Sequence, residues 1–292
     1  MTDIMLSGEG LTAHICTCGA ELIHFEHEEH GSLLWNGDAR WWDRRSPILF
    51  PVVGRCAGDR IRVGGETYPM PLHGFAHSLE FEVVEQERDR CRLRLRDSDA
   101  TRLHYPFAFS LEISYRLDDS ALRVEAIVHN PTGSVLPASF GFHPGFRWPL
   151  AAGVAKESHV LVFEADEELD VSRARAGLIG PDIETMALED RALALSEHLF
   201  DEGAMVMKRL ASRRVRLSAP DAPLAVEVGF RNLPSLGIWM RPSGDFLCIE
   251  PWAGHGDPAG FAGDLSDKPG IVSIAPGASA SFGMEVAVLG KP

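Results

Sequence analysis

Two histidines and one glutamate lie among apolar, glycine or proline neighbours, where a surface loop would carry polar residues. They are His73 in the segment LHGF, His143 in FGFHPGF and Glu250 in CIEPW. An imidazole titrates near neutral pH unaided, and burial can raise the pKa of a glutamate toward the same range. If the fold brings the three side chains together, the sequence predicts proton transfer near neutral pH.

The two histidines differ in backbone context. Pro144 pushes the backbone of His143 toward extended conformations, and the surrounding phenylalanines can hold its ring rigidly and partly dry. A core histidine hydrogen-bonded to a backbone group fits this segment equally well. His73 precedes Gly74, where the backbone can approach a ligand closely. Taken alone, that segment favours an ordinary turn histidine.

Glu250 is predicted to end a strand, on the face that it shares with Phe246 and Cys248. A carboxylate on an apolar face is hard to explain as a solubilising group, and burial would make it a usable base. The alternative is a buried salt bridge to Arg241 or Arg55. The context favours a functional role.

Other residues could hold a ligand. Arg55 ends the apolar run PILFPVVGR and could donate two hydrogen bonds to vicinal hydroxyls or to a carboxylate, although structural pairing is nearly as good an explanation. The six tryptophans, Trp252 among them, include possible stacking platforms for a sugar, but most are expected in the core.

No metal or cofactor site is predicted. His73 and His77 are four residues apart, but the glycine between them and the strand-like context argue against a helical zinc motif. The sequence has no Gly-x-Ser-x-Gly elbow, phosphate-binding glycine loop or dinucleotide motif. Nucleophilic and cofactor-dependent chemistry are therefore not expected.

Composition narrows the class of protein. The 292 residues include 28 basic and 42 acidic side chains, and the net charge of −14 argues against nucleic acid or an anionic membrane as the main partner. No signal peptide and no membrane-length apolar run are evident. The five scattered cysteines favour reduced thiols, so a cytoplasmic location is predicted.

Apolar and polar residues alternate along much of the chain, which predicts strands with one buried face. The clearest are 91–96, 109–117, 122–128, 224–230 and 282–288, with a hairpin over 61–68 and turns at Asp118–Asp119 and 130–133. The basic stretch 209–216 is predicted to be the solvated face of a strand, and helical turns are expected only around 189–200. We predict one domain over residues 1–292, a large antiparallel β-sandwich.

Seven segments together resemble one family, the aldose 1-epimerases or mutarotases, in particular the branch that contains hexose-6-phosphate epimerase-like and LacX-like proteins. In chain order they are GAEL (19–22), LWNGD (34–38), PILFPVVGR (47–55), HGFA (73–76), GFHPGF (141–146), IEPW (249–252) and DKPGI (267–271). Single segments are weak signals, but seven in the family's order are specific, and they span nearly the whole chain.

The resemblance implies a large β-sandwich with a sugar site on its concave face. It implies that Glu250 is the general base at the anomeric hydroxyl, that His143 is the acid at the ring oxygen, and that His73 is a second histidine polarising the same region. It also implies that Arg55 binds substrate, and more weakly that Asp201 binds sugar hydroxyls.

One position departs from the branch, whose members often carry arginine after His-Gly-Phe-Ala, where this chain has His77. If that arginine holds a phosphate, its loss puts a sugar-phosphate substrate in doubt. A neutral hexose, or an anionic sugar held by Arg55 or Lys268, remains open. Together, His77, Trp252 and Lys268 complete the set of expected substrate-binding residues.

The sequence therefore predicts a cofactor-free isomerase that interconverts the α and β anomers of a hexose or hexose derivative, acting as a monomer or homodimer on a small carbohydrate. The first alternative is a non-catalytic sugar-binding or sensor protein on the same scaffold. The second is a polysaccharide lyase or hydrolase, but hydrolysis would need two acidic carboxyls and only one strong candidate is present.

Overall fold

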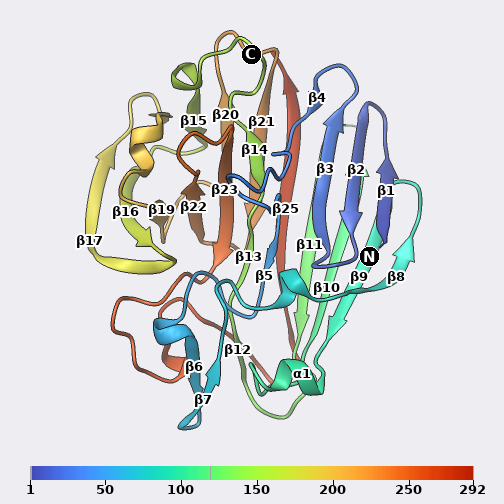
Figure 1. Cartoon of the computed structure of the whole chain (residues 1–292), viewed down its shortest axis with the longest axis vertical. Coiled ribbons are helices and arrows are strands. Elements are labelled where there is room, and N and C mark those ends of the chain that lie inside the picture. The colour runs from blue at the N-terminus through green and yellow to red at the C-terminus, as the bar shows by residue number, and fades with distance from the viewer. Residues whose placement is uncertain (1, 119, 292) are drawn as a thin grey trace.

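Antiparallel sheets make up most of the molecule in the computed structural model, which describes residues 2–118 and 120–291 (Figure 1). The largest sheet has nine strands. In spatial order they are β18 (Ala192–Ala194), β15 (Val160–Phe163), β20 (Arg214–Ser218), β21 (Leu224–Arg231), β25 (Ser279–Gly290), β11 (Ala121–His129), β10 (Ser110–Asp118), β9 (Arg90–Arg96) and β8 (Glu82–Gln86).

The second sheet has eight strands and carries most of the residues discussed below. Its order is β17 (Leu178–Ala187), β16 (Glu168–Arg175), β19 (Ala204–Met207), β22 (Ser235–Trp239), β23 (Phe246–Ala253), β13 (Phe140–Phe142) and β5 (Ile48–Leu49), and β14 (Gly145–Arg147) also pairs with β23.

A third sheet and two ribbons complete the strands. The third sheet contains β1 (Asp3–Ser7), β2 (Leu11–Cys16), β3 (Glu21–His27) and β4 (Gly31–Ser32). The ribbons are β6 (Arg60–Val63) with β7 (Glu66–Pro69), and β12 (Leu136–Ala138) with β24 (Val272–Ile274).

The helices are short. They are α1 (Asp99–Arg102) and the 3₁₀ turns η1 (Ala57–Asp59), η2 (Ala76–Ser78), η3 (Lys156–Ser158), η4 (Glu197–Phe200) and η5 (Leu265–Asp267). No helix within residues 2–118 and 120–291 is long and apolar enough to span a membrane.

The predicted alternation is confirmed in the long strands of the nine-stranded sheet. In β11, Val124, Ala126 and Val128 are buried, whereas Arg123 and Glu125 point outward. The strands β9 and β10 show the same pattern, and the hairpin predicted over 61–68 forms β6 and β7. Burial of one face against a second layer explains why a period of two could be recognised in the sequence.

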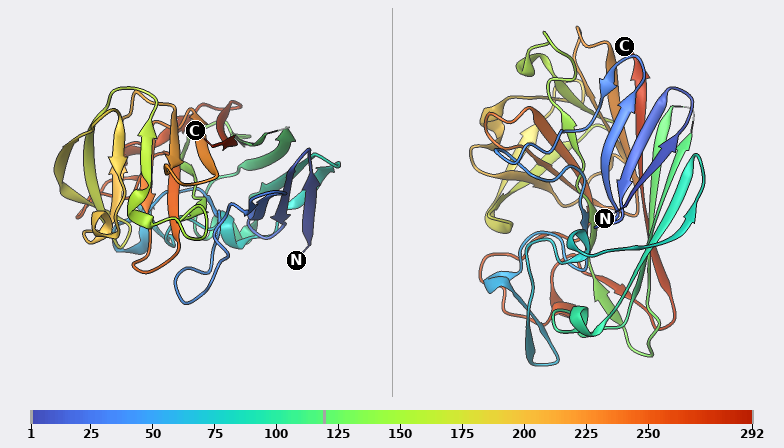
Figure 2. Two further views of the ribbon diagram at one scale, coloured as in Figure 1. Left: turned by 90° about the horizontal axis from the view of Figure 1, so that it is seen from above. Right: turned by 45° about the vertical axis from the view of Figure 1, so that its right-hand side comes forward.

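The sheets pack in layers, as the two views in Figure 2 show. Phe140 of β13 stacks on Phe282 of β25 with 5.0 Å between ring centroids, which joins the eight-stranded sheet to the nine-stranded sheet. The four-stranded sheet covers β9 and β10 at the other end. The largest apolar cluster includes side chains from Ile4 to Val286. A single domain over 1–292 stays a prediction.

Three local expectations need correction or qualification. Helical turns were expected around 189–200, but only the end of this segment is helical: residues 192–194 form the short strand β18, and the 3₁₀ turn η4 follows at 197–200. The basic stretch 209–216 is a strand only from Arg214 onward. The α-helical turn α1 was not expected, and a reciprocal capping box between Ser98 and Thr101 stabilises it. Asp119 of the predicted turn lies outside the described residues.

The phenol of Tyr115 tests the packing of the four-stranded sheet. Tyr115 is buried in β10, and its hydroxyl donates a hydrogen bond of 2.7 Å to the backbone oxygen of Ala20. Tyr115→Phe leaves that buried carbonyl without this donor, so we expect the free energy of unfolding to fall by about 1–2 kcal/mol in urea titrations. Tyr68→Phe, at a half-buried side chain in the otherwise exposed strand β7, is the control. Equal midpoints for both variants and wild type would contradict this account.

Candidate active site

A cavity of about 790 Å³ opens over the eight-stranded sheet. Strands β5, β16, β17, β19, β22 and β23 contribute residues to its lining, as do the loops around 42–47, 71–77, 143 and 201–203. His73, His143 and Glu250 all lie on its wall. Three segments far apart in the sequence thus present titratable groups to one space.

Glu250 lies within strand β23, which continues to Ala253, so the expectation that Glu250 ends the strand was wrong. Every residue of β23 is buried, because Leu247 and Ile249 face the main core while Cys248 packs in a separate aromatic cluster. Glu250 itself is only 2% exposed. Its partner is neither Arg241 nor Arg55, the salt bridges considered from the sequence.

The partner of Glu250 is His143, whose Nε2 lies 3.1 Å from Glu250 Oε2. The contact lacks hydrogen-bond geometry, so this oxygen has no hydrogen-bond partner within the described part of the chain. The other ring nitrogen of His143, Nδ1, also has none among the described residues. Trp42 stacks on the His143 ring at 4.9 Å between centroids. The pair is therefore close, fixed by an aromatic wall, and still able to bond to a ligand.

Burial acts on the two groups in opposite directions. It raises the pKa of the Glu250 carboxyl well above its usual range and, with a smaller contribution from His73, lowers the pKa of the His143 imidazole well below its usual range. The physical cause is the cost of holding a charge away from water. A carboxylate in this position is a stronger base, and an imidazolium a stronger acid, than either would be in solution.

The backbone fixes the tautomer of His73, and burial keeps its ring neutral. The residue has a left-handed conformation with φ of 64°, and its Nδ1 accepts a hydrogen bond of 3.1 Å from the Gly54 amide. An amide can only donate, so the proton of the neutral ring sits on Nε2. Burial lowers the pKa of His73 to about 3. Its ring centroid is 5.4 Å from that of His143, which makes His73 a neutral donor beside the pair.

Glycines allow a tryptophan to form part of the lining. Trp252 is 4% exposed, and a Cβ on Gly141 or Gly237 would lie 2.5 Å from its ring. Only glycine on the adjacent strands β13 and β22 leaves room for the indole. Its Nε1 is buried without a hydrogen-bond partner among the described residues, so it can donate to a ligand.

Arg44 brings a positive charge to the cavity beside His77. Its Nη1 donates a 2.9 Å hydrogen bond to the His77 carbonyl, and it lies 3.4 Å from a carboxylate oxygen of Glu21. Buried Glu21 also accepts hydrogen bonds from the amides of Arg45 and Ser46. Glu21, in one of the segments that carried the family resemblance, thus fixes the loop that places Arg44.

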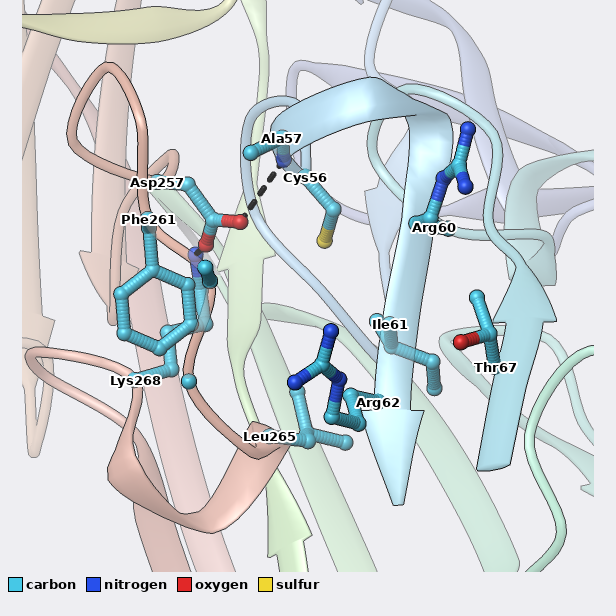
Figure 3. Close-up of a pocket in the computed structure, with 12 residues that line it drawn as sticks. Cys56, Ala57, Arg60, Ile61, Arg62, Thr67, Asp257, Phe261, Leu265 and Lys268 are labelled. Atoms are coloured by element: carbon cyan, nitrogen blue, oxygen red, sulfur yellow. Dashed lines mark hydrogen bonds and ion pairs between the residues drawn. The ribbon is translucent and has the colours of Figure 1, made fainter. Parts of the chain in front are cut away.

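The other expected ligand-binding residues are divided between two places. Asp201 lines the cavity but is exposed and pairs with His198. The guanidinium of Arg55 bonds to Asp59 and to the carbonyl of Ala176 and is absent from the lining. Lys268 lies in a separate small pocket, shown in Figure 3, where it is buried against Asp257. Direct contact of Arg55 or Lys268 with a ligand in the main cavity therefore has no support from the geometry.

Several lining residues escaped the sequence analysis. Arg44, Arg175 and Glu202 are in segments that read as ordinary polar loops or strand ends, so no local signal marked them. The WW pair before Arg44 was visible, but the sequence could not separate tryptophans of the core from those of the cavity. Trp42 and Trp239 both line it.

One group of residues within the described chain has the spacing of metal ligands. Ligand atoms of His143, Cys248 and Glu250 all lie within 4.8 Å of one another. The fit is poor, because burial raises the pKa of the Cys248 thiol well above its usual range, whereas a metal binds the thiolate. His73 and His77 do not belong to this group, and the absence of a metal requirement stays a prediction.

His77 gives a measurable pH dependence of stability. Burial, followed by the nearby Arg44, lowers the pKa of His77 to about 4 from 6.5. Between these two pH values the unfolded chain binds a proton at His77 that the folded chain does not bind. The contribution of His77 to stability is therefore full above pH 6.5 and is lost as the pH falls toward 4. His77→Gln should reduce the slope of the free energy of unfolding against pH by up to ~1.4 kcal/mol per pH unit, measured by urea titrations at several pH values. His198→Gln, at a side chain that is 91% exposed, is the control; equal slopes for His77→Gln and wild type would refute the assignment.

Comparison with known proteins identifies the family of this chain. A family model described as Aldose 1-epimerase matches residues 3–226. The plasmid and chromosomal forms of protein LacX from Lactococcus lactis subsp. lactis are each 28% identical over 283 residues, which cover 94% of this chain and 95% of LacX.

Solved structures confirm the predicted sandwich. A galactose mutarotase related enzyme from Lactobacillus acidophilus has a TM-score of 0.94 at 28% identity, covering 99% of this chain and 98% of its own. A galactose mutarotase-like protein from Lactobacillus casei has a TM-score of 0.92 at 27% identity, with coverages of 98% and 100%. The resemblance noted in the sequence is thereby confirmed, and the chain belongs to the aldose 1-epimerase family.

Proposed function

We propose that the protein is an aldose 1-epimerase that opens and recloses the ring of a hexose or hexose derivative by acid–base catalysis. The observation that carries this proposal is the buried pair of Glu250 and His143, 3.1 Å apart on the cavity wall. The anomeric hydroxyl and the ring oxygen of a cyclic aldose are bonded to the same carbon. A base for one and an acid for the other must therefore both lie close to that carbon, and two neighbouring groups on the cavity wall can meet this requirement.

In the proposed reaction, the Glu250 carboxylate takes the proton of the anomeric hydroxyl while the His143 imidazolium protonates the ring oxygen. The bond from the anomeric carbon to the ring oxygen breaks, and a free aldehyde forms. Rotation about the adjacent carbon–carbon bond exposes the other face, and closure reverses both proton transfers. The pair begins charged and ends neutral at ring opening, so the burial that penalises both charges favours this step.

His73 and Trp252 have supporting roles in this proposal. The Nε2–H of His73 is available as a neutral donor to the ring-oxygen region, since the Gly54 amide occupies Nδ1. The Nε1–H of Trp252 has no hydrogen-bond partner among the described residues and can bind a sugar hydroxyl. Asp201, at the exposed side of the cavity, is a further candidate for binding hydroxyls.

Location and assembly are part of the same proposal. The five cysteines form no disulfide, which fits a reducing compartment, so we infer a cytoplasmic enzyme. The partner is a small carbohydrate, and the active form is a monomer or a homodimer.

Conservative substitutions of the pair provide the main test. Glu250→Gln and His143→Asn keep shape and much of the sugar affinity but remove the base or the acid. Each should lower the catalysed rate of anomer exchange by roughly 10²–10⁴-fold. The rate is measured by saturation-transfer NMR on a freshly dissolved α-anomer after subtraction of the spontaneous rate.

The pH profile provides a further readout of the same experiment. The wild-type rate should fall at low pH, where the pair takes up a second proton, and at high pH, where it loses its only one. Burial disfavours both of these charged states, so a broad plateau is expected between the two limbs. If wild type matches the buffer blank on every hexose and hexose 6-phosphate while sugar still binds, the sensor alternative replaces the epimerase.

Arg44 tests the charge of the substrate. His77 in place of an arginine was expected to weaken selection for a phosphate, but Arg44 places a guanidinium beside His77 on the same wall. If it contacts an anionic group, Arg44→Gln should lower the preference for hexose 6-phosphate over hexose, as a ratio of kcat/KM values, by roughly 10- to 100-fold. Arg45→Gln is the matched control, since Arg45 does not line the cavity. An unchanged ratio would mean that the cavity does not read substrate charge through Arg44.

A further inference from the structure

A second buried ion pair lies behind the cavity wall, between Lys268 and Asp257 (Figure 3). Their side chains are 1% and 4% exposed. Elsewhere in the described residues only His143 and Glu250 are comparably buried, and every other ion pair has at least one side chain that is more than a quarter exposed. Desolvation makes a buried ion pair a poor source of stability, so its value here must be sought in the geometry that it imposes.

Asp257 connects three segments of the chain. Its carboxylate accepts hydrogen bonds from Lys268 Nζ and from the Ala57 amide, the latter at 2.8 Å. Its own amide donates to the Arg55 carbonyl, and its carbonyl accepts from the Ile179 amide, both at 2.9 Å. The loop after β23, the loop around residues 54–57 and the start of β17 therefore meet at this one residue.

Glycines let these segments touch backbone to backbone on the cavity side. Gly54, Gly177 and Gly256 all line the main cavity. A Cβ on Gly54 would lie 2.5 Å from the Cα of Gly256, and one on Gly256 would lie 2.0 Å from the Gly177 oxygen. Contacts this close leave little slack, so a displacement of one segment moves the others.

The loop held by Asp257 also sets the state of His73. The Gly54 amide donates to His73 Nδ1 at 3.1 Å, and the Gly54 carbonyl accepts from the His73 amide at 2.8 Å. Ala57, which bonds to the Asp257 carboxylate, lies three residues further along the same loop. A continuous set of contacts thus runs from Lys268 through Asp257 to the ring of His73.

We propose that Lys268 and Asp257 form a positioning pair, which holds the Gly54 amide where it keeps Nδ1 of His73 an acceptor and Nε2 a donor toward the cavity. Lys268 then acts through Asp257 and makes no contact with the substrate. The effect on rate rests on the proposed function, whereas the effect on the His73 tautomer does not.

The test reads the tautomer by ¹⁵N NMR of the imidazole nitrogens, with the His73 signals assigned by their loss in His73→Gln. Two variants break the pair. Lys268→Met removes the cation. Lys268 and Ala57 donate to different oxygens of the Asp257 carboxylate, and Asp257→Asn replaces one of these acceptors with an NH₂ donor. In each, we expect His73 to change from a single Nε2–H tautomer to a mixture. We also expect kcat to fall by about 10- to 100-fold with a smaller change in KM, as for misplacement of a group that acts in the transition state.

Two controls separate positioning from general stability. Leu265→Ala truncates a buried side chain in the same pocket with no bond to Asp257, so it should lower the melting temperature without changing the tautomer. Lys268→Arg retains the charge and should keep most of the wild-type tautomer and rate.

Each outcome decides the proposal. Wild-type tautomer and kcat in folded Lys268→Met and Asp257→Asn would overturn it, as would an equal tautomer change in Leu265→Ala. If Lys268→Met does not fold, Asp257→Asn decides alone. If the wild type proves inactive on all sugars, the epimerase assignment fails, and the tautomer comparison still establishes or removes the role of the pair.

Discussion

The burial of one carboxylate against one imidazole is the constraint on which the site depends. Glu250 lies on a strand that is buried along its whole length, and His143 is also buried, so water cannot solvate a charge on either side chain. The pair is cheap to hold when it carries one proton and expensive with two or none. Burial therefore favours reactions in which the pair keeps one proton in total, by exchange between its two members or with a bound molecule. Mutarotation meets this condition, because the pair takes one proton from the sugar and returns another to it.

The rest of the cavity follows from making this burial possible. Bulky rings exclude water around the pair: Trp42 stacks on His143, and Trp252 forms part of the lining nearby. Rings of this size need space on neighbouring strands, and Gly141 and Gly237 provide it where any side chain would collide. The glycines of strands β13 and β22 are therefore required by the tryptophan that they face, and the segment FGFHPGF combines this packing role with the placement of His143.

The sequence predicted the parts of the structure that depend on local pattern. Alternation along β9, β10 and β11 revealed half-buried strands, and the unusual settings of His143 and Glu250 marked them as candidates. The surroundings of Arg44 and Lys268 could not be predicted, because they are set by partners distant in sequence. Glu21 of strand β3 holds Arg44 of a distant loop, and Lys268 pairs with Asp257 in a pocket separate from the cavity. Of the helical turns expected around 189–200, only the 3₁₀ turn η4 forms, because pairing of β18 with β15 makes residues 192–194 a strand.

The two buried ion pairs in the described part of the chain have similar burial but different chemistry, and they suit different roles. The ordinary pKa values of lysine and aspartate side chains differ by about 6.5 units, whereas those of histidine and glutamate differ by about two. A lysine–aspartate pair therefore has a strongly preferred location for its proton and suits a fixed structural role. In a histidine–glutamate pair the two pKa values are close, so the proton can lie on either group. Burial raises the pKa of Glu250 and lowers that of His143, which favours transfer of the proton from the imidazolium to the carboxylate. Residue chemistry thus separates the pair suited to hold the wall from the pair suited to react.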